Sequence, residues 1–131
     1  MPAKEGTMLN SENAVATVAV KDLDVARSFY EGKLGLKAES SQGQEAVTFV
    51  TGGSRLIVYR SQFAGTNKAT SVTWPVGDVE STVKALKAKG VAFEHYDMPQ
   101  AVRQGDVHVA GGNKAAWFKD PDGNIIAVVS R

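Results

Sequence analysis

A short motif that occurs twice constrains the fold of this chain more than any other feature. Val20-Lys-Asp-Leu23 and Val76-Gly-Asp-Val79 each follow a short apolar run typical of a strand, and each precedes apolar residues at helical spacing. In both copies the aspartate suits a helix N-cap, because its carboxylate can accept free N–H groups of the first helical turn. The pattern indicates one strand–helix unit written twice.

The first copy continues with segments that indicate three more strands. They are residues 36–40, followed by residues 46–51 and 55–59, which form a predicted hairpin around Gly52 and Gly53.

The second copy ends in the same way. Residues 91–94, 115–119 and 124–130 are its predicted strands, and Asp120-Pro-Asp-Gly123 is a strong turn signal between the last two. Residues 98–113 lack periodicity, so we expect an irregular loop there, of a length often found in lids and binding loops.

We therefore predict an α+β protein in which two βαβββ modules in one chain form curved mixed sheets around a cleft. A flexible lead-in is expected over residues 1–13, the first module over residues 14–62 and the second over residues 63–131, within a single structural domain. With 131 residues, of which 43% are hydrophobic, the chain can bury one core of this size.

Composition excludes several classes of function. The formal net charge is +1 and basic residues form no stripe, so no nucleic-acid partner is expected. No apolar run is long enough to span a membrane, and we expect no membrane partner and a cytoplasmic location. The chain has no cysteine, which excludes disulfides, thiolate catalysis and cysteine-ligated metal sites.

Two segments resemble a known superfamily. Val20-Lys-Asp-Leu-Asp-Val-Ala-Arg-Ser-Phe-Tyr-Glu-Gly-Lys-Leu-Gly-Leu36 and Trp117-Phe-Lys-Asp-Pro-Asp-Gly-Asn124, together with the duplication, are similar to the vicinal oxygen chelate superfamily. That superfamily includes glyoxalases, bleomycin-resistance proteins, fosfomycin-resistance enzymes and extradiol dioxygenases. The resemblance implies the fold, and it implies a homodimer, because members of this family often pair.

The resemblance also implies where a metal would bind. Its metal-dependent members carry histidine or glutamate before each capping aspartate and in the last strand of each module. Here those positions hold Val15, Ile57, Ser71 and Ala127. Three of these side chains have no lone pair to donate, and the neutral hydroxyl of the serine is a poor metal ligand. We therefore predict a metal-free member without a cofactor. His95 and His108 match no ligand spacing and are expected to be exposed, or satisfied within the loop.

The resemblance implies that Val15, Ile57, Ser71 and Ala127 face the cleft, and that Trp117, three residues before the Asp120 turn, faces it too. Strand alternation adds the other residues of the wall. The predicted ligand-binding residues are Val15, Thr17, Arg55, Ile57, Tyr59, Ser71, Thr73, Trp117 and Ala127. Alternatives remain for three of them: Trp117 as a core residue, Tyr59 at a rim or dimer interface, and Arg55 as a solvated surface side chain. A register error of one residue would move the whole set to the other face.

Three functions remain open, and they differ in what the cleft must supply. The first is metal-independent binding of a small hydrophobic or planar molecule, similar to the bleomycin-resistance branch, with no catalytic residue. The second is a lyase or isomerase that uses Tyr59, or the loop residues His95, Asp97 and His108, or a relocated metal. The third is a dimeric structural or regulatory module whose cleft is filled by side chains.

Overall fold

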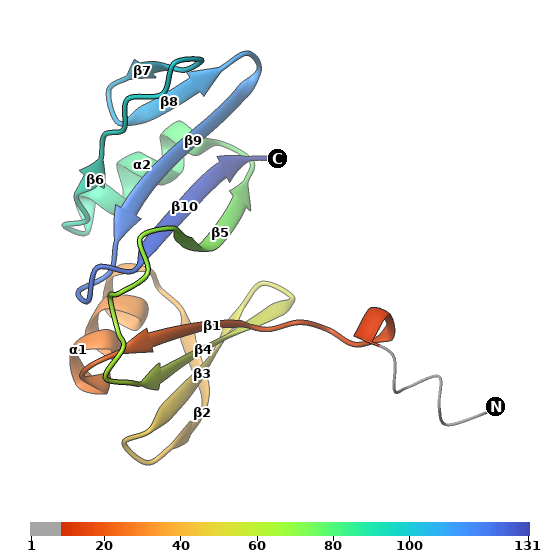
Figure 1. Ribbon diagram of the computed structural model, residues 1–131, viewed down its shortest axis with the longest axis vertical. Helices are drawn as coiled ribbons and strands as arrows, with labels where there is room; N and C mark the ends of the chain where they lie inside the picture. The colour runs from red at the N-terminus through yellow and green to blue at the C-terminus, as the bar shows by residue number, and fades with distance from the viewer. Residues whose placement is uncertain (1–8) are drawn as a thin grey trace.

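The computed structural model describes residues 9–131, whose strands form two sheets (Figure 1). A 3₁₀ turn, η2 (Leu9–Ser11), precedes the first sheet. This sheet has the strand order β1 (Ala16–Val20), β4 (Ser54–Arg60), β3 (Ala46–Thr51), β2 (Lys37–Gln42). β1 runs parallel to β4 and the other neighbours are antiparallel, as a βαβββ module requires.

The second sheet repeats this topology with two additional short strands. Its order is β5 (Thr70–Val76), β10 (Ile125–Ser130), β9 (Asn113–Lys119), β8 (Val107–Ala110), β7 (Val102–Gln104), and β6 (Phe93–Glu94) also pairs with β9. β5 and β10 are parallel, as β1 and β4 are. The predicted α+β class with duplicated mixed sheets is therefore confirmed.

The predicted irregular loop over residues 98–113 is wrong for its second half. β7 and β8 form a hairpin around Gly105, whose φ of 64° lies in the left-handed region that glycine adopts without strain. β7 has only three residues and all of them are exposed. Because no face of this strand is buried, its sequence shows no alternation of apolar and polar side chains from which a strand could be predicted.

The first helical segment brings two adjacent aromatic side chains into the core. α1 (Leu23–Arg27) begins at Asp22, whose carboxylate accepts two backbone N–H groups of the first turn, as predicted. The chain continues as a π-helical turn, η3 (Ser28–Lys33). The wider turn changes the helical spacing, and Phe29 and Tyr30 are both buried, with ring centroids 5.2 Å apart.

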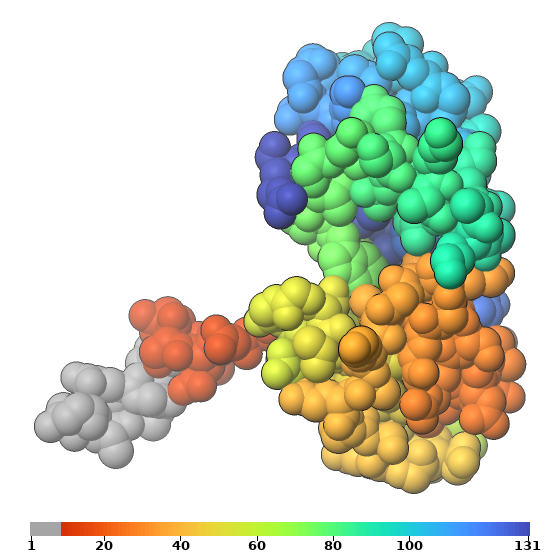
Figure 2. Space-filling view, turned by 180° about the vertical axis from the view of Figure 1, so that it is seen from behind, coloured from red at the N-terminus to blue at the C-terminus, as the bar shows by residue number. Residues whose placement is uncertain are grey.

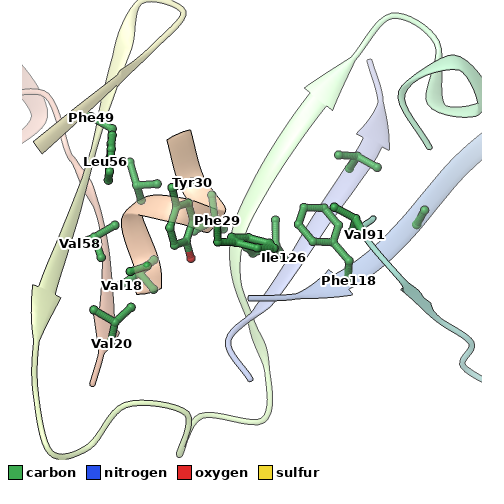
Figure 3. Packing of buried hydrophobic residues seen from close by; sticks show 14 of the residues in the cluster. Val18, Val20, Phe29, Tyr30, Phe49, Leu56, Val58, Val91, Phe118 and Ile126 are labelled. Atoms are coloured by element: carbon green, nitrogen blue, oxygen red, sulfur yellow. The ribbon is translucent and has the colours of Figure 1, made fainter. Parts of the chain in front are cut away.

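The core lies between the helices and one face of each sheet, and both helices lie on the same side of the molecule (Figure 2). α2 (Val79–Ala88), capped by the Asp78 side chain, covers the second sheet. The sheets contribute alternate residues to the core, among them Val18, Val20, Leu56, Val58, Phe118 and Ile126 (Figure 3). Phe29 contacts Phe118 with ring centroids 6.2 Å apart, so the two halves share one core.

A buried carboxylate joins the two halves. Asp120 begins the turn between β9 and β10, and it accepts hydrogen bonds from the Tyr30 hydroxyl at 2.7 Å and from the Asn124 amide at 2.8 Å. The same amide of Asn124 donates to the carbonyl of Ala19 in β1 at 2.8 Å. Burial, and then the charge of Asp120, raise the pKa of Tyr30, so its hydroxyl remains a donor.

Candidate functional site

The sheet faces opposite the helices turn to the same side of the molecule, toward the viewer in Figure 1. We call this side the open face; it carries Thr17, Ala19, Ile57, Tyr59, Thr73, Ala115, Trp117, Ala127 and Val129, which alternate with the core residues. Strand pairing joins them directly, because Thr17 lies opposite Ile57, and Ala127 lies between Thr73 and Trp117. The register assumed from the sequence is therefore observed, while the binding role of these residues stays a prediction.

On the first sheet the open face is apolar and accessible. Val15 directly before β1 is 42% exposed, and Tyr59 at the end of β4 is 40% exposed. Arg55 is not a free cation, because its Nε donates to Glu39 Oε1 at 2.6 Å and its second guanidinium nitrogen to Oε2 at 3.3 Å. An anionic ligand at Arg55 would have to compete with this carboxylate.

On the second sheet the predicted residues are already partly paired. Ser71 accepts a long hydrogen bond, 3.4 Å, from the amide of Asn67. Ala127 is only 2% exposed, which leaves its methyl group little surface for a ligand. Trp117 is half-buried, and its indole N–H donates to Thr70 Oγ1 at 3.2 Å. The core alternative for Trp117 is wrong, because Phe118 fills that role on the opposite face.

Trp117 belongs to an aromatic cluster that the sequence analysis missed. The ring centroid of Trp117 lies 5.0 Å from that of His108 and 5.4 Å from that of Tyr96, both in edge-to-face geometry. Tyr96 and His108 are 6.1 Å apart. We call these three residues the aromatic cluster. His108 comes from β8, Trp117 from β9, and Tyr96 from the segment after β6, so no local sequence pattern unites them.

The expectation for His108 is wrong, since the side chain is 3% exposed and lies in a strand. Its Nε2 accepts the backbone N–H of Tyr96 at 3.0 Å, so in the neutral ring the proton is on Nδ1. Neither this Nδ1 nor the Tyr96 hydroxyl, both buried, has a hydrogen-bond partner in the described part of the chain. Burial, and less strongly the Glu94 carboxylate, raise the pKa of Tyr96.

His95, in contrast, meets the expectation of an exposed and satisfied histidine. Its Nε2 lies 2.7 Å from Asp106 Oδ1, and Lys87 Nζ lies 2.7 Å from the other oxygen of the same carboxylate. This cluster of charges fixes the start of the segment that carries Tyr96. Lys87 first, and then His95, hold the pKa of Asp106 below its ordinary value.

Two hollows of about 340 and 420 Å³ meet at His108. The first lies over the open face of the second sheet, and Met98, Ala101, Ala115, Trp117 and Val129 line it with His108. The second lies under the segment after β6, where Tyr96, Asp97, Met98 and Arg103 are among its lining residues. The aromatic cluster therefore forms the wall of an unfilled space.

A third hollow of about 220 Å³ lies on the helix side, between the two halves of the chain. Leu34, Trp74 and Leu86 are among its apolar lining residues. Trp74 donates its indole N–H to Thr51 Oγ1 at 2.9 Å, so its polar atom is satisfied within the protein. We favour the hollows at His108 as the candidate site, because both adjoin this side chain, whose Nδ1 has no hydrogen-bond partner among residues 9–131.

The metal site implied by the resemblance does not fit the residues present. Val15, Ile57 and Ala127 have no side-chain lone pair, and Ser71 offers a hydroxyl that already accepts from Asn67. Among residues 9–131, no group of three or more histidine, aspartate or glutamate side chains is arranged to hold an ion. No helix in this described range is long and apolar enough to cross a membrane.

Comparison with known proteins assigns the family. The model of the Glyoxalase/Bleomycin resistance protein/Dioxygenase superfamily matches residues 13–128. The chain therefore belongs to this superfamily, in agreement with its duplicated topology. No curated protein matches it.

Solved structures of similar fold include a protein named as a resistance determinant, one named as an enzyme and one named as a binding protein. The bleomycin resistance determinant encoded on transposon Tn5 superposes with a TM-score of 0.72 at 18% identity, over 92% of this chain and 98% of its own. Lactoylglutathione lyase from Agrobacterium tumefaciens superposes with a TM-score of 0.69 at 19% identity, over 92% of this chain and 93% of its own. TnmS3, an antibiotic binding protein from Streptomyces sp. CB03234, superposes with a TM-score of 0.60 at 20% identity, over 92% of this chain and 97% of its own. At these identities the likeness concerns the fold alone.

Proposed function

We propose that this protein binds a small planar or hydrophobic molecule on its open face without a metal and without transforming it, as a drug- or metabolite-sequestering protein. The observation that carries the proposal is the chemistry of Val15, Ile57, Ser71 and Ala127, which leaves the centre of the open face without metal ligands. Two proteins with this fold, one named a bleomycin resistance determinant and the other, TnmS3, an antibiotic binding protein, support the same class of function.

The state of His108 favours binding over catalysis. A general base needs a free lone pair within reach of its substrate. The lone pair of His108 is on Nε2, where it already accepts the backbone N–H of Tyr96. A lyase or isomerase would have to break that hydrogen bond before His108 could take a proton, while a binder uses the ring as it stands.

The aromatic cluster suggests the shape of the ligand. The flat rings of Trp117, His108 and Tyr96 adjoin hollows of about 340 and 420 Å³, and volumes of this order suit a small organic molecule. Aromatic walls favour a planar ligand through stacking and edge contacts. Unfilled space at this position also argues against a structural module whose cleft is closed by side chains.

The test is a thermal-shift screen of the full chain with planar aromatic drugs and aromatic acids, followed by recovery of each hit. A ligand present at a hundred times its Kd should stabilise the native state by about 2.7 kcal/mol and raise Tm. Mass spectrometry should then recover the compound unchanged after long incubation. A panel without a single shift, or a hit returned as a different molecule, contradicts the proposal.

We also propose that two copies pair across their open faces. Ligand sites usually enclose most of the ligand surface, and a single chain leaves Val15 and Tyr59 of the first sheet exposed on the open face. Light scattering after size exclusion should give the mass of a dimer. Tyr59→Glu should yield a monomer, while Val25→Glu, at an exposed position of α1 on the helix side, should not. The proposed location is the cytoplasm, which cell fractionation tests.

A further inference from the structure

Two buried donor groups in the aromatic cluster lack partners. The Tyr96 hydroxyl and His108 Nδ1 are both closed to solvent, and neither has a hydrogen-bond partner within residues 9–131. Buried polar side chains in native proteins are nearly always hydrogen-bonded, so each exception calls for an explanation. Here both exceptions belong to residues that line the same hollow.

In this arrangement His108 Nδ1 can only donate, and the Tyr96 hydroxyl has a hydrogen to donate. His108 Nε2 is used as an acceptor, so Nδ1 carries the hydrogen in the neutral ring. The Tyr96 hydroxyl is held in its protonated form by burial and by the Glu94 carboxylate, both of which raise its pKa. A partner that satisfies the hydrogens of both groups must therefore offer hydrogen-bond acceptors.

The surroundings favour a neutral acceptor over an anion. Neither donor carries a formal charge, and Asp97 and Arg103 bring opposite charges to the same hollow. Arg103 also donates to the carbonyl of Gly105 at 3.0 Å. The hollow thus offers no clear excess of positive charge, whereas Trp117 beside it offers a flat apolar surface. A carbonyl oxygen on a planar ring system meets both requirements.

We propose that Tyr96 and His108 are the specificity-determining residues of this site, and that their free donors bind carbonyl oxygens of a planar aromatic ketone or quinone that lies against Trp117. This assignment rests on the proposed binding function and names the chemical class of its ligand. Both donors are closed to solvent in the free chain, and Asp97, Met98 and Ala101 line the same hollow, so the proposal requires this segment to move aside when the ligand enters.

The probes are 9-fluorenone and fluorene, which share one planar skeleton and differ in a single carbonyl group. Fluorenone should bind the full chain about fivefold to tenfold more tightly, the value of one net hydrogen bond. In Tyr96→Phe this preference should fall, while the affinity for fluorene stays the same. Because the deleted oxygen makes no bond in the free protein, Tm without ligand should not fall in this variant.

His108 is tested without substitution, because its Nε2 is needed by the backbone of Tyr96. Long-range ¹⁵N–¹H spectra of the imidazole should show the Nδ1–H tautomer in the free protein. The Nδ1 resonance should move with fluorenone and stay in place with fluorene. An Nε2–H tautomer, or equal shifts with both probes, overturns the assignment of this donor.

The outcomes separate the two proposals. Equal affinities for fluorenone and fluorene, or a preference that survives in Tyr96→Phe, overturn the donor assignment and leave the proposed binding function standing. A lower Tm of unliganded Tyr96→Phe also overturns it, because the hydroxyl would then be bonded in the free protein. If neither probe binds, this inference fails, and the thermal-shift panel decides the proposed function separately.

Discussion

The Tyr30 hydroxyl donates to the buried carboxylate of Asp120 at 2.7 Å, across the junction between the two halves of the chain. A hydrogen bond to a charged group contributes about 1.5–3 kcal/mol. We expect Tyr30→Phe to lower the free energy of unfolding by this amount, because Asp120 stays buried and loses a donor. Urea denaturation of the wild type and the variant measures this loss in the free energy of unfolding. Tyr59→Phe, in a side chain that is 40% exposed in the single chain, is the control and should change the free energy of unfolding little.

A glycine in the connection between the sheets is required by a close contact. Gly65 has a φ of 75°, and a Cβ at this position would clash with the backbone carbonyl of Asp122. Gly43 has a φ of 57° in a turn where a Cβ would meet nothing. Gly43→Ala should cost about 1–2 kcal/mol for the left-handed backbone alone. Gly65→Ala should cost clearly more in the same denaturation experiment; equal costs would contradict the contact.

Asp106 provides a pH-dependent contribution to stability. Lys87, and then His95, lower its pKa from the ordinary value of 3.8, so the ionised form is favoured in the folded protein. The stabilisation is therefore complete above the unfolded-state pKa, and it is lost as the pH falls through the lowered folded-state pKa. Because Lys87 is largely exposed, the stabilisation that ionised Asp106 provides should be about 0.2–1 kcal/mol.

The matching experiment compares the wild type with Asp106→Asn. At neutral pH the variant should be less stable by that amount, and the difference should disappear once the pH is below the folded-state pKa of Asp106. A difference that persists in acid would mean that packing, and not the charge of Asp106, explains the loss.

The two tryptophans offer a matched test of the open face. Each is partly buried and donates its indole N–H to a threonine, but Trp117 lies on the open face and Trp74 on the helix side. For any hit of the thermal-shift screen, Trp117→Phe should weaken binding by about tenfold, a loss of about 1.4 kcal/mol of contact. Trp74→Phe should leave affinity unchanged. Titration calorimetry gives both values, and the reverse order would place the ligand on the helix side.

Much of the fold could be predicted because local signals agree with each other. Asp22 and Asp78 cap helices in both copies, and both caps follow strands whose alternate residues are buried. That alternation also predicts Thr17 and Tyr59 on the same side of their sheet as Ile57, which the strand register confirms. A local pattern of this kind requires no knowledge of distant contacts.

The centre of the candidate site could not be predicted in this way. His108 is in a strand of four residues, too short for a clear period, and it is buried because the segment carrying Tyr96 folds over it. The ion pair of Arg55 with Glu39 likewise joins strands that are not neighbours in the sheet. Such contacts depend on how distant segments meet in space, which a single sequence does not display.

The central claim is that the middle of the open face holds a small organic molecule and no metal ion. Elemental analysis of the full chain, purified without chelators, tests this most directly. We predict that no divalent cation is present in a stoichiometric amount and that ligand binding is unaffected by prior treatment with a chelator. One tightly bound divalent ion per chain, whose removal abolishes binding, would contradict the account.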